Sequence, residues 1–210
     1  MPLPTAVTYP HPTPAELPAN RVDWRLDPSR AALLVHDLQH HFLRCFPPGT
    51  EPLTGLIDRT ARLIEAARAA GMPVIHTAQR GGQTPAQRGL QLDFWGPGVP
   101  ADPAAHGSPE RVAPAGDDIR LTKWKYSAFA RTDLEERLRA AGRDQLVVTG
   151  VYAHIGVLMT AADAWSRDLR AFVAADAVAD FSREDHDMAL RWAAGRCARV
   201  APTADLLKEF

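Results

Sequence analysis

Six short runs rich in apolar residues recur along the chain. They lie at 31–37, 72–78, 118–123, 144–152, 169–176 and 197–203. Apolar runs of this length, such as "AALLVHD" at 31–37, are typical of strands that are buried on both faces of a parallel sheet. We therefore predict a strand at each run.

Between these runs the apolar positions follow a helical spacing. One stripe consists of Leu56, Ile57, Thr60, Leu63, Ile64 and Ala67. This amphipathic helix is expected to end at Gly71, in a left-handed C-cap. Thr132 and Glu135 have the spacing of a capping box, which predicts a second helix that ends at Gly142.

Strands and helices thus alternate, and this order predicts the fold class. We expect a single-domain, three-layer α/β/α structure, with a mostly parallel sheet of about six strands and helices on both faces. Residues 1–30 contain seven of the 18 prolines, which predicts an extended arm outside the domain of residues 31–210. Such an arm often reaches a neighbouring subunit.

Composition and charge narrow the class of partner. The 210 residues are 46% hydrophobic and 23% charged, with a formal net charge of -1. The sequence lacks the basic stripe that is typical of nucleic-acid-binding proteins, so we expect a small-molecule partner. No apolar run approaches roughly 18 residues and no leader is apparent, so we expect no membrane association and a cytoplasmic location. Cys45 and Cys197 are interpreted as free thiols, with a disulfide between them left open.

Polar residues at the ends of the predicted strands are the candidates for chemistry, because ligands bind outside the carboxyl ends of parallel strands. The turn at 151–160, "VYAHIGVLMT", has Gly156 where many α/β hydrolases have a nucleophile. The candidates are Asp37, Gln79, Arg80, Lys123, Tyr152, His154, Asp176 and Asp180.

Several segments, in order, resemble the isochorismatase family, the cysteine-less branch of the isochorismatase-like (cysteine hydrolase) superfamily. They include "LLVHDLQHHF", "QLDFWGPG", "LTKWKYSAF" and "LVVTGVYAHIGV". The resemblance extends from residue 30 to 200 and implies a Rossmann-like fold. Within the family, the sequence is most similar to the branch that cleaves 2-amino-2-deoxyisochorismate in phenazine biosynthesis.

The resemblance implies a hydrolase that splits an enolpyruvyl ether into pyruvate and a cyclohexadiene acid, without a covalent intermediate. Its catalytic residues are then Asp37, Lys123 and Gly156. Asp37 donates a proton to the methylene carbon, Lys123 binds a carboxylate or orients Asp37, and Gly156 leaves room for substrate or water. For Asp37 a helix N-cap or a structural salt bridge is the alternative.

The substrate implied is a small dicarboxylate, which needs further polar partners. Gln79 and Arg88 match the family's positions, with Arg80 competing for the role of Arg88. Lys125 is interpreted as a solvated charge.

The turn after the fourth strand and two aromatic residues complete the expected binding site. The resemblance suggests that the Val151–Tyr152 peptide is cis and turns the amides near Ile155 and Gly156 toward the site. Phe42 and Trp95 are expected to form apolar walls, or else to be ordinary core residues.

Neither a metal nor a cofactor is expected. Relatives that bind a metal have an Asp-x-His pattern, whereas position 39 is Gln in this sequence, and a closed site needs three or four converging ligands. His36, His40, His41 and His76 are therefore not assigned as ligands. His154 is interpreted as a turn residue and His186 as a helix-surface residue.

Two other functions stay open. A thiol-dependent amidase of the nicotinamidase type needs Cys45 or Cys197 to reach Asp37, and a non-catalytic binding subunit would have lost its nucleophile. A homodimer is expected from the proline-rich arm and the family's habit, with Trp24 as a possible anchor, and a monomer with the arm folded back on itself stays open. The chain ends at Phe210 without the carrier domain that siderophore-forming relatives append, and this favours the amino substrate over isochorismate.

Overall fold

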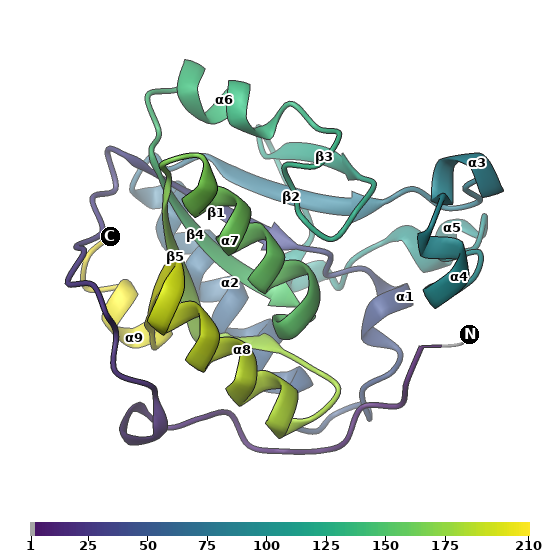
Figure 1. Ribbon diagram of the computed structural model, residues 1–210, viewed down its shortest axis with the longest axis horizontal. Helices are drawn as coiled ribbons and strands as arrows, with labels where there is room; N and C mark the ends of the chain where they lie inside the picture. The colour runs from purple at the N-terminus through teal and green to yellow at the C-terminus, as the bar shows by residue number, and fades with distance from the viewer. Residues whose placement is uncertain (1–2) are drawn as a thin grey trace.

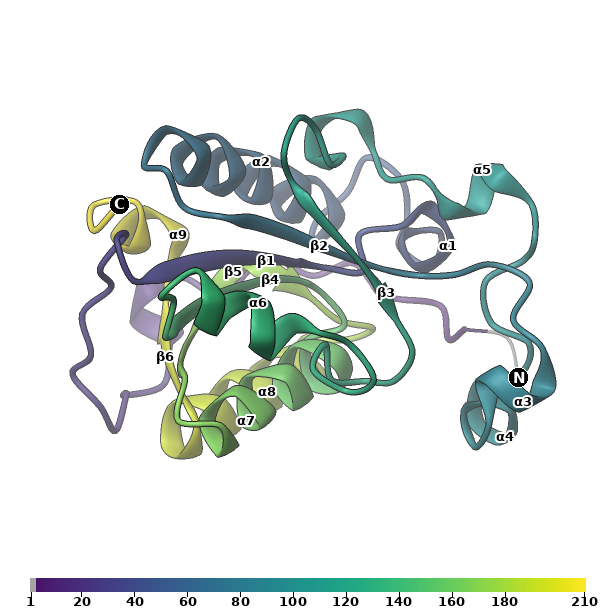
Figure 2. The same cartoon turned by 90° about the horizontal axis from the view of Figure 1, so that it is seen from above.

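The computed structural model describes residues 3–210 as a six-stranded sheet between two layers of helices (Figures 1 and 2). All neighbouring strands are parallel, in the order β3-β2-β1-β4-β5-β6. The strands are β1 Ala31–His36, β2 Val74–Gln79, β3 Ile119–Lys123, β4 Gln145–Val151, β5 Arg170–Ala179 and β6 Ala198–Ala201. The predicted fold class is confirmed, and each predicted run contains a strand, with ends that differ by up to three residues.

The strand order reverses between β1 and β4, which lie side by side at the centre of the sheet. Chain connections leave these two strands in opposite directions, so a crevice opens at their carboxyl ends. Both strands are buried throughout, which explains their nearly continuous apolar sequence.

Helices cover the two faces of the sheet separately, as the edge-on view of Figure 2 shows. The first face packs against the predicted apolar stripe, and the second against three helices. On the first face lie α2 Leu53–Ala69 and α9 Thr203–Leu206; on the second lie α6 Leu134–Ala140, α7 Leu158–Ser166 and α8 Arg183–Arg196.

The helix ends agree only partly with the sequence prediction. Gly71 and Gly142 follow α2 and α6 with φ values of 68° and 66°, the left-handed conformation that was expected. The predicted capping box at Thr132 is wrong. Asp133 is the N-cap of α6; the Thr132 hydroxyl accepts from the Leu134 amide at 3.3 Å and donates to the Ala128 carbonyl, and it does not bond to Glu135.

Short elements occupy the arm, the long segment between β2 and β3, and the loops near the strand ends. They are α1 His40–Leu43, α3 Pro85–Arg88, α4 Gln91–Trp95, α5 Pro103–His106, the 3₁₀ turns Pro14–Glu16 and Glu110–Val112, and a π-helical turn Ala153–Val157. No helix was predicted between residues 79 and 117, because none of the short helices there is long enough to show a periodic pattern.

The described part of the arm, residues 3–30, lies along its own chain. Tyr9 is buried and its hydroxyl contacts His186 Nδ1 at 3.1 Å, while the Ala6 amide donates to the Cys45 carbonyl. His186 is fully buried beneath the arm, so its interpretation as a helix-surface residue is wrong. Helix periodicity alone did not show that the arm covers this face.

Within residues 3–210, none of the helices combines the length and the apolar character that a bilayer crossing requires.

Candidate active site

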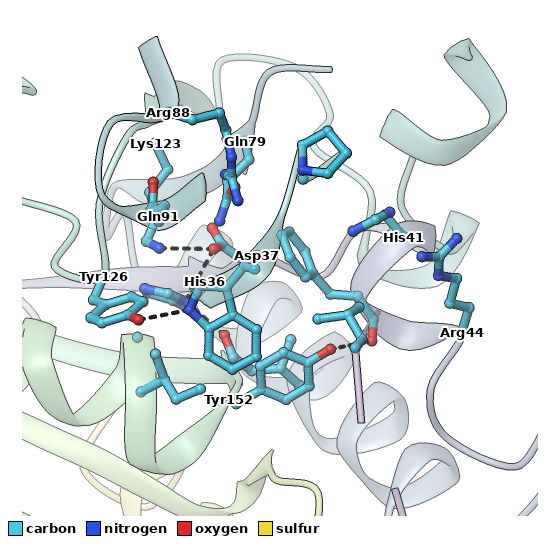
Figure 3. A pocket seen from close by; sticks show the side chains of 18 residues that line it. His36, Asp37, His41, Arg44, Gln79, Arg88, Gln91, Lys123, Tyr126 and Tyr152 are labelled. Carbon is cyan, nitrogen blue, oxygen red and sulfur yellow. Dashed lines mark hydrogen bonds and ion pairs between the residues drawn. The ribbon is translucent and has the colours of Figure 1, made fainter. Parts of the chain in front are cut away.

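A cavity of about 340 Å³ opens at the carboxyl ends of β1, β2, β3 and β4 (Figure 3). All nine residues that the sequence analysis assigned to the site line this cavity. They are Asp37, Phe42, Gln79, Arg88, Trp95, Lys123, Tyr152, Ile155 and Gly156. Their roles remain predictions, but the structure brings them together from five separate segments of the chain.

Asp37 and Lys123 form a buried ion pair at the bottom of this cavity. Lys123 Nζ lies 2.9 Å from Asp37 Oδ2, and the two residues are 2% and 4% exposed. The Thr77 hydroxyl donates to Asp37 Oδ1 at 2.6 Å. Both carboxylate oxygens thus have a donor, and Asp37 is not a helix N-cap.

The charge balance favours the ionised form of Asp37. Burial raises the pKa of this carboxyl group, but the Lys123 ammonium and the hydrogen bond from Thr77 more than offset burial. The net pKa lies below its ordinary value. In the free protein Asp37 is therefore a carboxylate.

Arg88, rather than Arg80, reaches the cavity. Its guanidinium donates to Gln79 Oε1 and to the Gly96 carbonyl, both at 3.1 Å, and Arg88 is only 2% exposed. Arg80 is exposed and lies outside the lining. Figure 3 shows Arg88 and Gln79 beside Asp37. Two donors and an ammonium thus converge where a carboxylate-bearing ligand would bind.

Lys125 is not the solvated charge that the sequence predicted. It is half-buried, and its Nζ donates to the Arg88 carbonyl at 3.1 Å, so it is not simply a solvated charge. This contact joins the segment after β3 to α3.

Aromatic side chains form the apolar part of the wall. Phe42 and Tyr152 pack edge to face, and Trp95 donates its indole N–H to the Tyr126 hydroxyl at 2.7 Å. The Val151–Tyr152 peptide is cis, as expected. The Ile155 amide, however, donates to the Tyr152 carbonyl at 3.1 Å, so it is not free to bind a ligand.

Gly156 does not leave empty room, contrary to expectation. A Cβ atom at this position would lie 2.1 Å from Cε1 of His36, so the imidazole of His36 fills the adjacent space.

Neither thiol is placed for nucleophilic attack in this cavity. Both cysteines are free and buried, and neither lines the cavity. Cys45 Sγ contacts the Phe42 carbonyl, and burial raises the pKa of its thiol. Cys197 packs with α8 and β6 on the other face of the sheet, where burial raises its pKa to about 11.

The histidines weighed as metal ligands do not converge. His76 contacts Asp118, and His36 Nδ1 lies 2.8 Å from the Val151 carbonyl. Among residues 3–210, the one group with suitable ligand spacing is His154, Asp180 and Asp185. Asp180 Oδ2 there already accepts from the His154 amide and ring, which accounts for its burial without an ion.

The two aspartates near the end of β5 do not enter the cavity. Asp176 lies within the strand and accepts from the Thr203 amide and hydroxyl at the start of α9. Asp180 belongs to the His154 contact. The end of β5 is thus structural rather than part of the site.

Nine further lining residues were not assigned to the site from the sequence. They are Leu3, His36, His41, Arg44, Gln91, Pro97, Gly98, Tyr126 and Val151. Two sequence signals were available: His36 precedes Asp37, and Tyr126 follows Lys123 by three residues. Val151 is the last residue of β4. The others lie on the arm or in short loop elements, whose position depends on tertiary packing.

Comparison with known sequences gives a consistent result. A family model described as the isochorismatase domain matches residues 31–205. Phenazine biosynthesis protein PhzD1 of Pseudomonas aeruginosa is 51% identical over 206 residues, which cover 98% of this chain and 99% of that protein. Isochorismatase of Bacillus subtilis is 48% identical over 210 residues, covering 100% of this chain and 67% of that protein.

Solved structures with the same fold include hydrolases of other specificity. A cysteine hydrolase from Pseudomonas syringae pv. phaseolicola has a TM-score of 0.80 at 25% identity, covering 91% of this chain and 96% of that one. N-carbamoylsarcosine amidase from Thermoplasma acidophilum has a TM-score of 0.70 at 28% identity, with 83% and 96% covered.

Proposed function

The chain belongs to the isochorismatase family, and we propose that it hydrolyses the enolpyruvyl ether of 2-amino-2-deoxyisochorismate or isochorismate. The products are pyruvate and trans-2,3-dihydro-3-hydroxyanthranilate or 2,3-dihydro-2,3-dihydroxybenzoate. One observation carries the proposal: a buried carboxylate, Asp37, lies at the bottom of a cavity whose described lining includes cationic donors but no cysteine.

The chemistry begins with proton transfer to carbon. Protonated Asp37 donates to the terminal methylene of the enol ether, whose π electrons form the new C–H bond and leave an oxocarbenium ion. Asp37, now a carboxylate, stabilises this cation. Water adds to the cationic carbon and returns a proton to Asp37. The resulting hemiketal then collapses: its C–O bond to the former ether oxygen breaks, its hydroxyl becomes the ketone of pyruvate, and the hydroxyl proton passes to the leaving oxygen, which stays on the ring as an alcohol.

Substrate binding supplies the protonated form of Asp37. The substrate brings two carboxylates into a buried site, and their negative charge raises the pKa of a neighbouring carboxyl group. A substrate carboxylate also competes with Asp37 for Lys123 Nζ, which removes the contact that holds Asp37 ionised. Asp37 then takes up a proton as the complex forms.

The aromatic walls and Arg88 complete the site. Phe42, Trp95 and Tyr152 exclude bulk water from the cation, and Arg88 with Gln79 binds the second carboxylate. This pairing leaves Lys123 for the carboxylate nearest the reacting double bond.

The amino substrate is the preferred one in this proposal. PhzD1, a phenazine biosynthesis protein, matches this chain over 99% of its own length. The thiol-dependent alternative has no support from the geometry, because neither cysteine lines the cavity. Comparing kcat/KM for the two substrates tests the preference.

We also propose a cytoplasmic homodimer. Both thiols are free, which suits a reducing compartment. Leu90, which precedes α4, and Phe94, which lies in it, are large, apolar and exposed. They offer a contact surface for a second copy. Trp24 packs against Phe172 of its own chain, so it is a weaker anchor than expected. Light scattering of the purified chain measures its mass and tests the dimer.

Asp37→Asn tests the reaction itself. Asn keeps the shape of Asp37 but has no proton to deliver, so we expect kcat to fall about 1,000-fold. Pyruvate release, coupled to lactate dehydrogenase, measures turnover. Lys123→Met is expected to lower turnover as well, through binding or through the orientation of Asp37.

Asp93→Asn is the matched control, since Asp93 is exposed on α4 and outside the cavity lining. It is expected to keep normal turnover. Near-normal turnover of Asp37→Asn would exclude Asp37 as the proton donor, and a wild-type protein that releases pyruvate from neither substrate would exclude the function.

A further inference from the structure

Gly156 lies against the side chain of His36, in a position where backbone conformation does not require glycine. Gly156 is not among the glycines with positive φ, so its main chain would accept any L-residue. A Cβ atom there would lie 2.1 Å from Cε1 of His36 and 2.8 Å from its Nε2. The imidazole is therefore what excludes a side chain at 156.

The imidazole of His36 is not free to move aside. His36 is 0% exposed, and its Nδ1 lies 2.8 Å from the Val151 carbonyl, to which it donates. Burial lowers the pKa of His36 to about 4, so the ring is neutral at the bottom of the cavity. On the other side, a Cβ atom at Gly150 would lie 2.1 Å from the His36 carbonyl oxygen. His36 is thus enclosed by two glycines, one beside its ring and one beside its main chain.

His36 is also joined directly to the proposed proton donor. Asp37 follows it in sequence with φ at 52°, a conformation that non-glycine residues seldom adopt. His36 Nδ1 lies 3.8 Å from Asp37 Oδ2. A displacement of the ring therefore moves the carboxyl group and the pair it forms with Lys123.

We propose that His36 and Gly156 form an interlocked pair, in which the imidazole fills the space of a side chain at 156 and thereby positions Asp37. The positioning of Asp37 for catalysis rests on the proposed function, whereas the packing of His36 against Gly156 does not. Gly156 then acts through His36, and not by admitting substrate or water. His36 is a positioning residue, and its presence is incompatible with any side chain at 156, nucleophilic or not.

The interlocked pair predicts a specific kinetic signature. Gly156→Ala pushes the ring and displaces Asp37, so we expect kcat to fall about 100-fold while KM changes less than about threefold. If Gly156 instead provided room for substrate, the added methyl group would raise KM.

A double-mutant cycle with His36→Ala tests the pair. His36→Ala removes the ring and is expected to lower kcat about tenfold, because Asp37 loses its support. In that background Gly156→Ala meets no ring and is expected to change kcat by less than about threefold. Gly195→Ala is the matched control, since Gly195 lies in α8 with nothing within 4 Å of its Cβ position, and it is expected to be neutral in both backgrounds.

Thermal unfolding of the wild type, the two single variants and the double variant gives a second cycle that needs no substrate. Gly156→Ala is expected to lower Tm by about 5 °C with His36 present, and by much less in the His36→Ala background. If the single variant fails to fold, recovery of folded protein in the double variant supports the pair.

Three results would overturn the inference: an unchanged kcat and Tm for Gly156→Ala, an equal loss in both backgrounds, or an effect confined to KM. Failure of the wild-type protein to turn over either substrate would exclude the proposed function, and the thermal cycle would still decide the packing of His36 against Gly156.

Discussion

Asp37 is a carboxylate in the free protein but acts as an acid in the proposed reaction, so its proton is taken up with the substrate. The Lys123 ammonium holds the pKa of Asp37 below its ordinary value despite burial. Formation of the competent complex consumes one proton, so kcat/KM falls tenfold for each pH unit above the pKa of Asp37 in the free protein.

This charge balance predicts different pH profiles for kcat/KM and kcat. The first reports the free protein and is expected to fall about tenfold per pH unit from about pH 5 to 8. The second reports the complex, where the pKa of Asp37 is raised, so kcat is expected to stay level to a higher pH. Initial rates of pyruvate release across this range provide the measurement. A kcat/KM that stays constant through the range contradicts proton donation by Asp37.

Arg88 and Arg80 form a natural pair for testing carboxylate binding. Arg88→Ala removes the buried guanidinium beside Gln79 and is expected to raise KM more than about tenfold. Arg80 is exposed and lies outside the cavity lining, so Arg80→Ala is expected to change KM less than about twofold. Equal KM values for the two variants would remove Arg88 from the binding site.

At the scale of elements, α3 and α4 carry one wall of the cavity on very short helices. Two side-chain contacts hold them to the segment after β3: Lys125 Nζ to the Arg88 carbonyl, and Trp95 Nε1 to the Tyr126 hydroxyl. The chain then turns back through Gly98, with φ at 77°, against the guanidinium of Arg88. The position of Arg88 thus depends on this turn.

Gly98→Ala tests that dependence. A Cβ atom there would lie 2.7 Å from Cζ of Arg88, so we expect the guanidinium to be displaced and KM to rise about tenfold. Gly116→Ala is the matched control, because Gly116 also has a positive φ but nothing within 4 Å of its Cβ position. Both variants lose stability from backbone strain, and only Gly98→Ala is expected to change KM. A similar KM for both would show that the turn does not position Arg88.

At the scale of the whole molecule, the arm closes one side of the domain and reaches the site. Leu3 lines the cavity, Tyr9 contacts His186, and His11 is buried with Nε2 2.9 Å from the Pro52 carbonyl. Because buried histidines resist protonation, the docking of the arm is sensitive to acid. Burial lowers the pKa of His11 to about 4, although the hydrogen bond to the Pro52 carbonyl favours the charged ring.

The sign of this effect predicts loss of stability in mild acid. The unfolded chain protonates His11 near its ordinary pKa of 6.5, whereas the folded chain does so only near 4. The contribution of a neutral His11 is thus complete above about pH 6.5 and decreases as the pH falls toward 4. His11→Gln keeps a donor for the Pro52 carbonyl and does not titrate.

Urea unfolding at about pH 7.5 and 5 provides the measurement. The wild-type protein is expected to lose about 2 kcal/mol more unfolding free energy between these pH values than His11→Gln does. His40→Gln is the control, since His40 is exposed, and it is expected to follow the wild type. The same loss in His11→Gln would show that His11 does not couple the arm to pH.

The sequence by itself determined the six strands, the parallel α/β architecture and the residues at the strand ends. A strand buried on both faces leaves a local apolar run, and the order of runs and helices leaves few topologies. Asp37 and Lys123 could therefore be assigned to one edge of the sheet although 86 residues separate them.

Only the tertiary structure decided which loop side chains reach the cavity and what surrounds them. The choice of Arg88 over Arg80, the burial of His186 under the arm, and the imidazole of His36 beside Gly156 depend on contacts between segments distant in sequence. Local periodicity does not encode these contacts, because short turns and irregular loops take their positions from the surfaces on which they pack.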